Sequence, residues 1–168
     1  NIEPLPDKGK RLVFLSVLKV LNRILEAKKE GESLVRIWGN DYPVEEFPKR
    51  ICVFVDELNK FAPAGKAFSA IKAPIIDIAA RGRSIGLSLI GAQQLASQVD
   101  EEILANTSTQ AVGRTHSIEL RGTAYEWLRF SLKERATVLK HGEVIVNHAI
   151  HNAPVILRFP IPLHRIPP

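Results

Sequence analysis

Two adjacent carboxylates, Asp56 and Glu57, directly follow a run of five apolar residues, 51–55. Such a run, mostly β-branched or aromatic, is typical of a strand buried on both faces of a parallel sheet. Open α/β sheets bind ligands at the carboxyl edge, where these acids would lie. There one acid can hold Mg²⁺ through water, while the other polarises a water that attacks a γ-phosphate. The alternative interpretation is a core strand followed by solvated acids.

Two further polar side chains follow predicted strands. Residues 87–92 form an apolar strand that ends at Gln93, and residues 109–113 lead to Arg114. The right-handed crossover rule brings the ends of successive parallel strands to one edge, so we expect both side chains near the acids. The Gln93 amide can bond both water and γ-phosphate, or simply cap a turn. Arg114 can reach phosphates, although a surface salt bridge is the commoner fate of such an arginine.

The elements that position these residues follow from hydrophobic periodicity and from helix start and stop signals. Gly31 and Pro74 mark a helix end and a helix start, Asp100 is a candidate N-cap, and Ser131 with Glu134 resembles a capping box. Helices are predicted at residues 10–29, 74–81, 100–106, 117–127 and 131–141, and a closing strand pair at residues 143–148 and 154–159. Residues 31–50 are predicted to be a surface connection. Strands alternating with helices predict an α/β fold with a parallel sheet.

Composition restricts the class of protein. The 168 residues fit one domain, and 45% hydrophobic with 24% charged residues is ordinary for a globular protein. A net charge of +5 fits contact with a polyanion, nucleotide or DNA, without requiring it. The single cysteine, Cys52, lies in the predicted core strand, which indicates a reducing compartment. No apolar stretch is long enough to cross a bilayer, so we expect a cytoplasmic protein that does not bind membranes.

No phosphate-binding loop of the form G-x-x-x-x-G-K-[ST] occurs in the sequence. Gly65 and Lys66 form a Gly-Lys pair, but Ala67 follows it, and we interpret this segment as a turn. The chain opens on Asn1 and contains no methionine, so we expect a fragment or a processed product. Without the loop whose amides cradle phosphates, the chain alone is expected neither to bind ATP tightly nor to hydrolyse it.

Between residues 53 and 114 the sequence closely resembles the FtsK/HerA superfamily, and HerA-like ATPases in particular. The resemblance rests on an ordered series: Phe54-Val55-Asp56-Glu57-Leu58 as the Walker B element, then Ala80-Arg81-Gly82-Arg83-Ser84-Ile85-Gly86, then Leu89-Ile90-Gly91-Ala92-Gln93. It implies the C-terminal part of a RecA-like P-loop NTPase fold, mainly a parallel sheet flanked by helices with a terminal strand pair. Residues 1–168 would be one partial domain, and residues 160–168 an extended proline-rich tail.

The same resemblance implies a function. A HerA-like motor is a hexameric ring that hydrolyses ATP with Mg²⁺, translocates double-stranded DNA and works with a nuclease of the NurA type in DNA end processing and repair. Asp56 would bind Mg²⁺ through water, Glu57 would orient the attacking water, and Gln93 would sense the γ-phosphate. Arg114 would contact the phosphates of the same nucleotide.

Arg81 and Arg83 follow Pro74 by up to about three helical turns, or ~15 Å, which carries them away from Asp56 and Glu57. Geometry therefore favours action in trans, as arginine fingers on the nucleotide of the adjacent subunit. The alternative interpretation is a solvated basic helix end that complements the helix dipole.

Two other functions are compatible with these residues. A VirB4-like or conjugative coupling ATPase shares the acidic strand, and a non-catalytic DNA-binding or interaction module derived from such a motor would explain the missing phosphate loop. Lys60, Lys66 and Lys72 are compatible with a basic loop facing DNA, although a solvated charged surface is the commoner arrangement.

Overall fold

The computed structural model describes residues 4–65 and 69–160. The chain divides into two compact units, residues 1–106 and 107–168, and each is described by itself. Of the predicted site residues, only Arg114 belongs to the second unit. Lys66 and most of the predicted proline-rich tail lie outside the described residues. No helix in the described ranges is long and apolar enough to cross a membrane.

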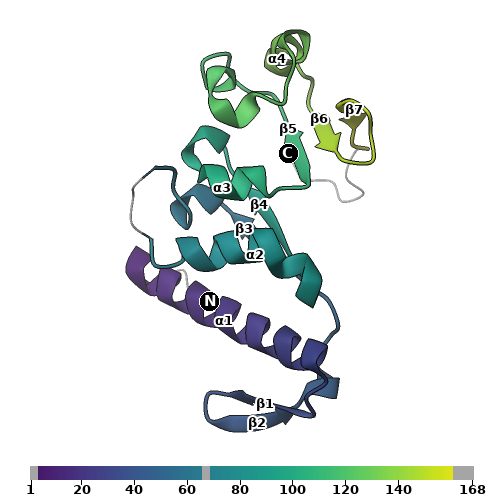
Figure 1. The fold of residues 1–168 in the computed structure, drawn as a ribbon. Helices are drawn as coiled ribbons and strands as arrows, with labels where there is room; N and C mark the ends of the chain where they lie inside the picture. The colour runs from purple at the N-terminus through teal and green to yellow at the C-terminus, as the bar shows by residue number, and fades with distance from the viewer. Residues whose placement is uncertain (1–3, 66–68, 161–168) are drawn as a thin grey trace. The chain divides into compact units, whose positions relative to one another are not determined.

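The first unit combines two long helices with a parallel strand pair and a hairpin (Figure 1). Its main elements are α1 (Asp7–Glu30), β1 (Leu34–Ile37), β2 (Asn40–Pro43), β3 (Ile51–Asp56), α2 (Lys72–Ile85), β4 (Leu87–Ala92) and α3 (Glu101–Ala105). Short 3-10 turns include η2 (Leu58–Lys60) and η3 (Ala96–Gln98). The predicted helices at residues 10–29, 74–81 and 100–106 and the strands at 51–55 and 87–92 are therefore confirmed, with small shifts of their ends.

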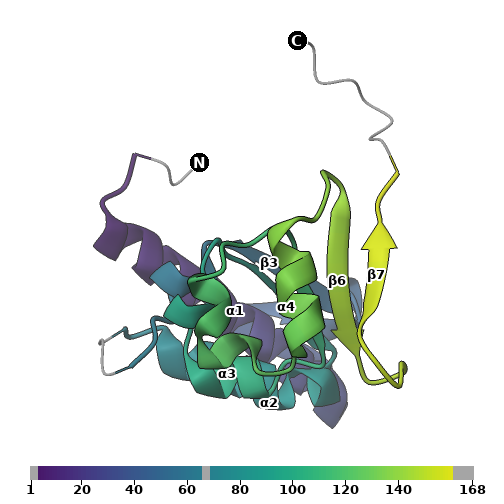
Figure 2. The same cartoon turned by 90° about the horizontal axis from the view of Figure 1, so that it is seen from above.

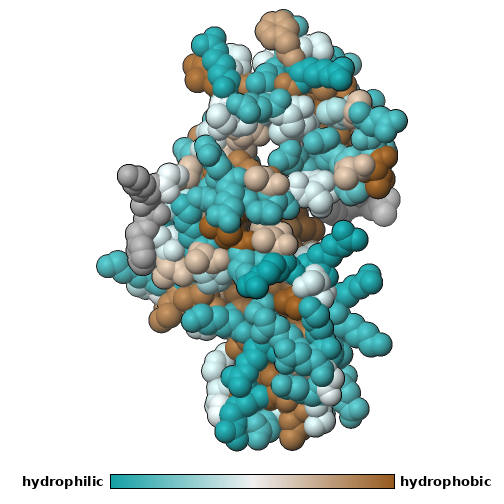
Figure 3. Space-filling view, in the orientation of Figure 1, coloured by the Kyte–Doolittle hydropathy of each residue, from teal (hydrophilic) through white to brown (hydrophobic). Residues whose placement is uncertain are grey.

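Helices α1 and α2 cover one face of the β3–β4 pair. Residues at helical spacing on α1, such as Leu18 and Leu25, are buried with Ile75 of α2, Val55 of β3 and Leu87 of β4. These five side chains are at least 96% buried and form the centre of the core. The outer surface of the two helices is mainly hydrophilic (Figure 3), which is the amphipathic arrangement that their sequences predict.

The opposite face of the β3–β4 pair is exposed. Phe54 and Ile90, which lie side by side in the parallel register, are 65% and 52% exposed, and Cys52 is exposed as well. The prediction that this strand is buried on both faces is therefore wrong for the side that carries Cys52 and Phe54. The physical reason is that α1 and α2 both pack against the side that carries Val55.

Residues 31–50, predicted to be a surface connection, contain the β1–β2 hairpin. Trp38 and Gly39 form its two-residue turn, with φ of 48° and 88°, as a primed hairpin turn requires. Val35 and Ile37 of β1 alternate inward and are buried against Ile24 of α1. The hairpin lies by the C-terminal end of α1 (Figure 1).

The second unit is built on an antiparallel sheet of order β5-β6-β7, formed by Thr109–Val112, Glu143–His148 and Val155–Arg158. Helix α4 (Phe130–Thr137) lies between β5 and β6 in the chain, and Figure 2 shows β6 beside β7. The predicted closing strand pair is thus present. The prediction that β5 continues the parallel sheet is wrong, because β5 pairs antiparallel with β6.

Candidate functional site

The acidic pair lies where β3 ends. Asp56 is the last residue of the strand, and its Oδ1 accepts a hydrogen bond of 2.9 Å from the backbone N–H of Glu57. Glu57 has φ of 53°, a left-handed conformation that residues other than glycine rarely adopt. This conformation turns the chain sharply, so that Leu58 is buried in the core while Asp56 stays exposed. A strained backbone of this kind is common at functional sites.

Gln93 lies beside the acidic pair. Asp56 of β3 is in register with Ala92 of β4, and the two strands are parallel. The residues that follow them, Glu57 and Gln93, therefore leave the sheet at the same edge. Within the described residues, Oε1 of Gln93 is buried and accepts no hydrogen bond. A buried acceptor without a donor is costly, so Gln93 has unused hydrogen-bonding capacity at this edge.

Close packing brings the chain after β3 against β4. A Cβ atom added to Gly91 would lie 2.5 Å from Cδ2 of Leu58, so any larger residue would force the Leu58 side chain to shift. Gly91 therefore helps to place the turn that carries Glu57 next to the strand end that carries Gln93.

Lys60 forms an ion pair with Glu57. The sequence predicted Lys60 only as part of a basic loop. A hydrogen bond to Glu57, reinforced by the charges of Glu57, Asp7 and Asp56, raises the pKa of Lys60 above its ordinary value. The i, i+3 spacing of the two residues was the sequence signal for this contact. Lys72 forms an ion pair with Asp100. The positive charges of Lys60 and Lys72 are therefore both paired with carboxylates rather than free to form a basic loop.

These residues match part of what a magnesium nucleotide needs. Asp56 and Glu57 offer carboxylate oxygens, which suit Mg²⁺ when water and phosphates complete the shell. No cluster of three or more His, Cys, Asp or Glu side chains suited to a metal ion occurs in the part of the chain that the structure describes. The donor set therefore fits a metal shared with phosphates better than a metal held by protein alone.

Arg81 and Arg83 lie in the last turns of α2, both exposed. Because α2 leads into the first residue of β4, they lie toward the edge of the sheet opposite to Asp56 and Gln93. The Nε atom of Arg81 donates to Oδ1 of Asp77 at 2.6 Å, within the same helix. The predicted separation of the arginines from the acids is therefore present, whereas their role in trans stays a prediction.

The structure explains why glycine occupies positions 82 and 86 of the segment that contains Arg81 and Arg83. A Cβ atom on Gly82 would lie 2.5 Å from the carbonyl oxygen of Leu87, so α2 could not approach β4 as it does. Gly86 ends α2 with φ of 84°, and a Cβ there would lie 2.5 Å from the carbonyl oxygen of Lys49. Packing alone thus accounts for the glycines of this motif, but not for its arginines.

Arg114 is exposed and follows β5 in the second unit. Its neighbour Thr115 is tied to α4 through a backbone hydrogen bond of 3.1 Å to the carbonyl of Ala136. Because β5 belongs to the antiparallel sheet, the strand argument that assigned Arg114 to the same edge as Gln93 does not hold. A role of Arg114 at phosphates stays a prediction.

Comparison with known proteins finds a similar fold but no similar sequence. No family model matches the chain, and no curated protein matches it significantly in sequence. Among solved structures, the chain is similar to the genome packaging NTPase B204 from Sulfolobus turreted icosahedral virus 2 in complex with AMPPCP. The TM-score is 0.55 and the sequence identity 14%, and the match covers 70% of this chain and 57% of that one. The same NTPase in complex with ATP-gammaS gives a TM-score of 0.49, also with 14% identity, over 66% and 52%.

At this identity the similarity establishes the fold alone. The chain has the predicted mixed α/β fold, with a parallel strand pair, flanking helices and a terminal antiparallel pair, and shares it with an NTPase. The chain spans little more than half the length of the solved structures that it matches.

Proposed function

We propose that this chain is part of an ATP-hydrolysing motor of the FtsK/HerA superfamily. The observation that carries the proposal is the register of β3 and β4, which brings Asp56, Glu57 and Gln93 to one sheet edge, with a buried acceptor of Gln93 unpaired there. The fold shared with an NTPase supports it. Three polar side chains of these types at one edge suit phosphoryl transfer to water.

Each residue has a separate role in the proposed reaction. Asp56 would hold Mg²⁺ through water, and the ion would neutralise charge on the phosphates. Glu57 accepts a proton from the attacking water or orients it, and the Gln93 side-chain amide forms the second hydrogen bond to that water. The Gln93 amide nitrogen is then available to the γ-phosphate. The phosphate-cradling loop comes from outside these 168 residues, so the isolated chain should be inactive.

The wider function that we propose is that of a HerA-like motor. It would act as a hexameric ring on double-stranded DNA, with a NurA-type nuclease, in the cytoplasm. Arg81 and Arg83 would then act on the nucleotide of the neighbouring subunit, and Arg114 on phosphates. The order of the motifs between residues 53 and 114 supports this assignment.

Steady-state ATPase assays on the full-length protein test the proposal. E57Q should lower kcat by about 10²- to 10⁴-fold, as expected for loss of a general base. Q93A should lower kcat with little change in KM, because Gln93 acts on the water rather than on nucleotide binding. Q94A is the matched control, since Gln94 is the exposed neighbour in the same turn. Wild-type rates for both E57Q and Q93A would refute the proposed site.

The missing phosphate loop favours a second candidate, a non-catalytic DNA-binding or interaction module. A VirB4-like or conjugative coupling ATPase is the rival among enzymes. The sequence that precedes these residues in the gene discriminates among the three. A G-x-x-x-x-G-K-[ST] stretch there supports a motor, transmembrane or secretion-specific segments support the coupling ATPase, and a complete reading frame without the loop supports the module.

A further inference from the structure

The two chain segments that leave the proposed site are bonded to each other. One is residues 58–65, which follow Glu57, and the other is residues 94–100, which follow Gln93. Their contacts are an isolated antiparallel bridge between Pro63 and Val99, backbone hydrogen bonds from Ala64 to Gln98 at 2.8 Å and from Asp100 to Ala62 at 3.1 Å, and a bond from Asn59 Nδ2 to Gln98 Oε1 at 3.1 Å. We call this pair of segments the bracket.

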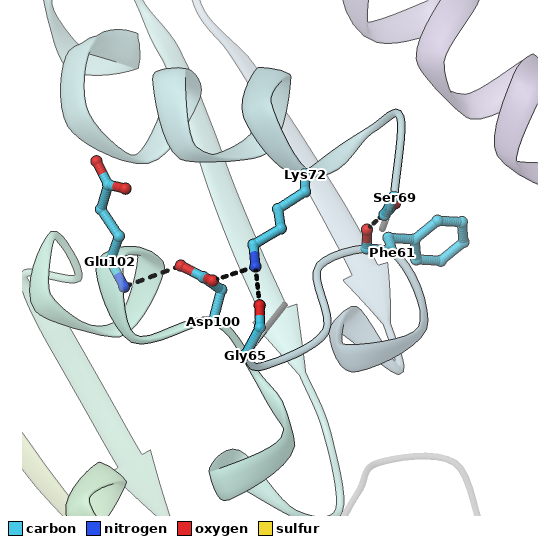
Figure 4. Close-up of polar contacts among 6 residues, drawn as sticks. All are labelled: Phe61, Gly65, Ser69, Lys72, Asp100 and Glu102. Carbon is cyan, nitrogen blue, oxygen red and sulfur yellow. Dashed lines mark hydrogen bonds and ion pairs between the residues drawn. The ribbon is translucent and has the colours of Figure 1, made fainter. Parts of the chain in front are cut away.

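An ion pair closes the bracket at its far end (Figure 4). The Nζ atom of Lys72 lies 2.5 Å from Oδ2 of Asp100 and donates a bond of 2.8 Å to the carbonyl of Gly65. The side chains of Lys72 and Asp100 are only 20% and 14% exposed, unlike those of the Arg36–Asp41 pair at 64% and 46%. Removal of either partner from a pair this buried leaves an uncompensated charge, so this contact carries more weight than a surface pair.

The remaining contacts of the ion pair join it to two helices. Oδ1 of Asp100 accepts a bond of 3.0 Å from the backbone N–H of Glu102 and so caps α3. Ser69 is buried, and its hydroxyl donates to the carbonyl of Phe61 at 2.5 Å (Figure 4), which ties the chain just before α2 to the bracket a second time. Lys72 is the first residue of α2. The two segments of the bracket, α2 and α3 therefore meet at this ion pair.

We propose that Lys72 is a positioning residue for the proposed hydrolysis: through Asp100 and the bracket it holds Glu57 and Gln93 in the relative position that a shared water requires. Lys72 itself lies beyond the bracket and contacts neither side chain. Small displacements of a water-orienting pair are expensive, since about 1 Å of misplacement can cost roughly 10²-fold in rate. The inference rests on the proposed ATPase function.

Kinetics on the full-length protein test this role with the variants K72M, D100N and K72R. K72M removes the charge with similar length, and D100N keeps an acceptor for the α3 cap while it removes the partner charge. Both should lower kcat for ATP at least about tenfold, with KM and the Kd of MgADP nearly unchanged, because ADP lacks the phosphate that the water attacks. K72R should recover most of the rate. R36M, which breaks the exposed Arg36–Asp41 pair, is the matched control and should have the wild-type rate.

Amide hydrogen exchange gives a readout that does not depend on turnover. K72M and D100N should speed exchange at Ala64 and Asp100, the two donors within the bracket, and also around Gln93. Wild-type kcat in both variants would overturn the inference, and so would an equal loss of kcat and MgADP affinity, which marks general destabilisation. Exchange that speeds at the bracket while kcat stays normal would also overturn it. An inactive wild-type protein would instead refute the proposed function, and this inference with it.

Discussion

Glu57 carries a carboxylate at the proposed site and has a backbone conformation that is unfavourable for any residue with a Cβ atom. Left-handed φ costs a residue with a Cβ about 1–2 kcal/mol, and the cost is tolerated here because Leu58 is buried directly after it and Lys60 binds its carboxylate. A glycine would remove this strain but also the carboxylate. A glutamate rather than a glycine at this left-handed position points to a chemical role rather than a packing role.

Lys60 should remain charged under all ordinary assay conditions. Its pKa is raised above the ordinary 10.5, chiefly by the hydrogen bond to Glu57. A raised folded-state pKa means that the pair stabilises the fold below the ordinary value, and that this contribution is lost only as the pH rises through the raised value. A step in activity between about pH 6 and 9 would therefore have to come from another group.

The two glycines that lie within helices should respond in opposite ways to alanine. G82A should destabilise the protein by about 1–3 kcal/mol, because its Cβ would meet the backbone carbonyl of Leu87 at 2.5 Å. G9A is the matched control. Its Cβ would be 3.4 Å from the Cβ of Leu5, an ordinary contact, so the gain in helix propensity should stabilise by about 0.5–1 kcal/mol. Urea denaturation measures both, and equal effects of the two substitutions would contradict this account.

At the scale of elements, α2 links two parts of the proposed motor. It begins at Lys72, beside the bracket, and carries Arg81 and Arg83 about 15 Å away in its last turns. If Arg81 and Arg83 act on the nucleotide of the neighbouring subunit as proposed, α2 is a physical route between one active site and the next.

A subunit-mixing experiment tests whether the arginines act in trans. If the full-length protein forms the proposed ring, E57Q subunits alone, or R81A/R83A subunits alone, should be nearly inactive. Mixed rings should regain activity, because an intact Glu57 of one subunit can face intact arginines of its E57Q neighbour. The matched control is R36A, another exposed arginine paired with an aspartate, which should leave the rate unchanged. Mixtures no more active than the separate variants, or full activity of R81A/R83A alone, would remove the arginines from the site in trans.

Capping and turn signals in the sequence predicted some element ends correctly and others wrongly. The N-cap at Asp100 is present, because its carboxylate needs only a backbone N–H two residues away. The capping box predicted at Ser131 is not, since α4 begins at Phe130 and Ser131 lies within it. The β1–β2 hairpin was missed because Trp38-Gly39 is not one of the usual turn pairs.

At the scale of the whole molecule, the charge is distributed unevenly. Residues 107–168 hold eight of the 23 Lys and Arg residues but only four of the 18 Asp and Glu residues, and all five histidines. Residues 1–106 are nearly neutral by the same count. If the protein binds duplex DNA as proposed, the second unit should supply most of the phosphate contacts.

Salt dependence of DNA binding by the full-length protein tests this expectation. The variant R121Q/R129Q removes two exposed arginines of the second unit and should reduce the slope of log K against log salt concentration by about one to two. The matched variant K19Q/R23Q removes two exposed cations of α1 and should leave the slope unchanged. An equal reduction by both variants would show that binding follows net charge alone. A change only with K19Q/R23Q would assign the contacts to the first unit.

The sequence by itself determined the helices and the parallel strands of the first unit, and the order in which Asp56, Glu57 and Gln93 follow strands, because periodicity and caps are signals carried by neighbours in the chain. Only the tertiary structure decided which face of β3 is covered, that β5 pairs with β6, and that Lys72 binds Asp100. These depend on contacts between residues far apart in the chain, where several partners satisfy the same local pattern. Packing and burial choose among them.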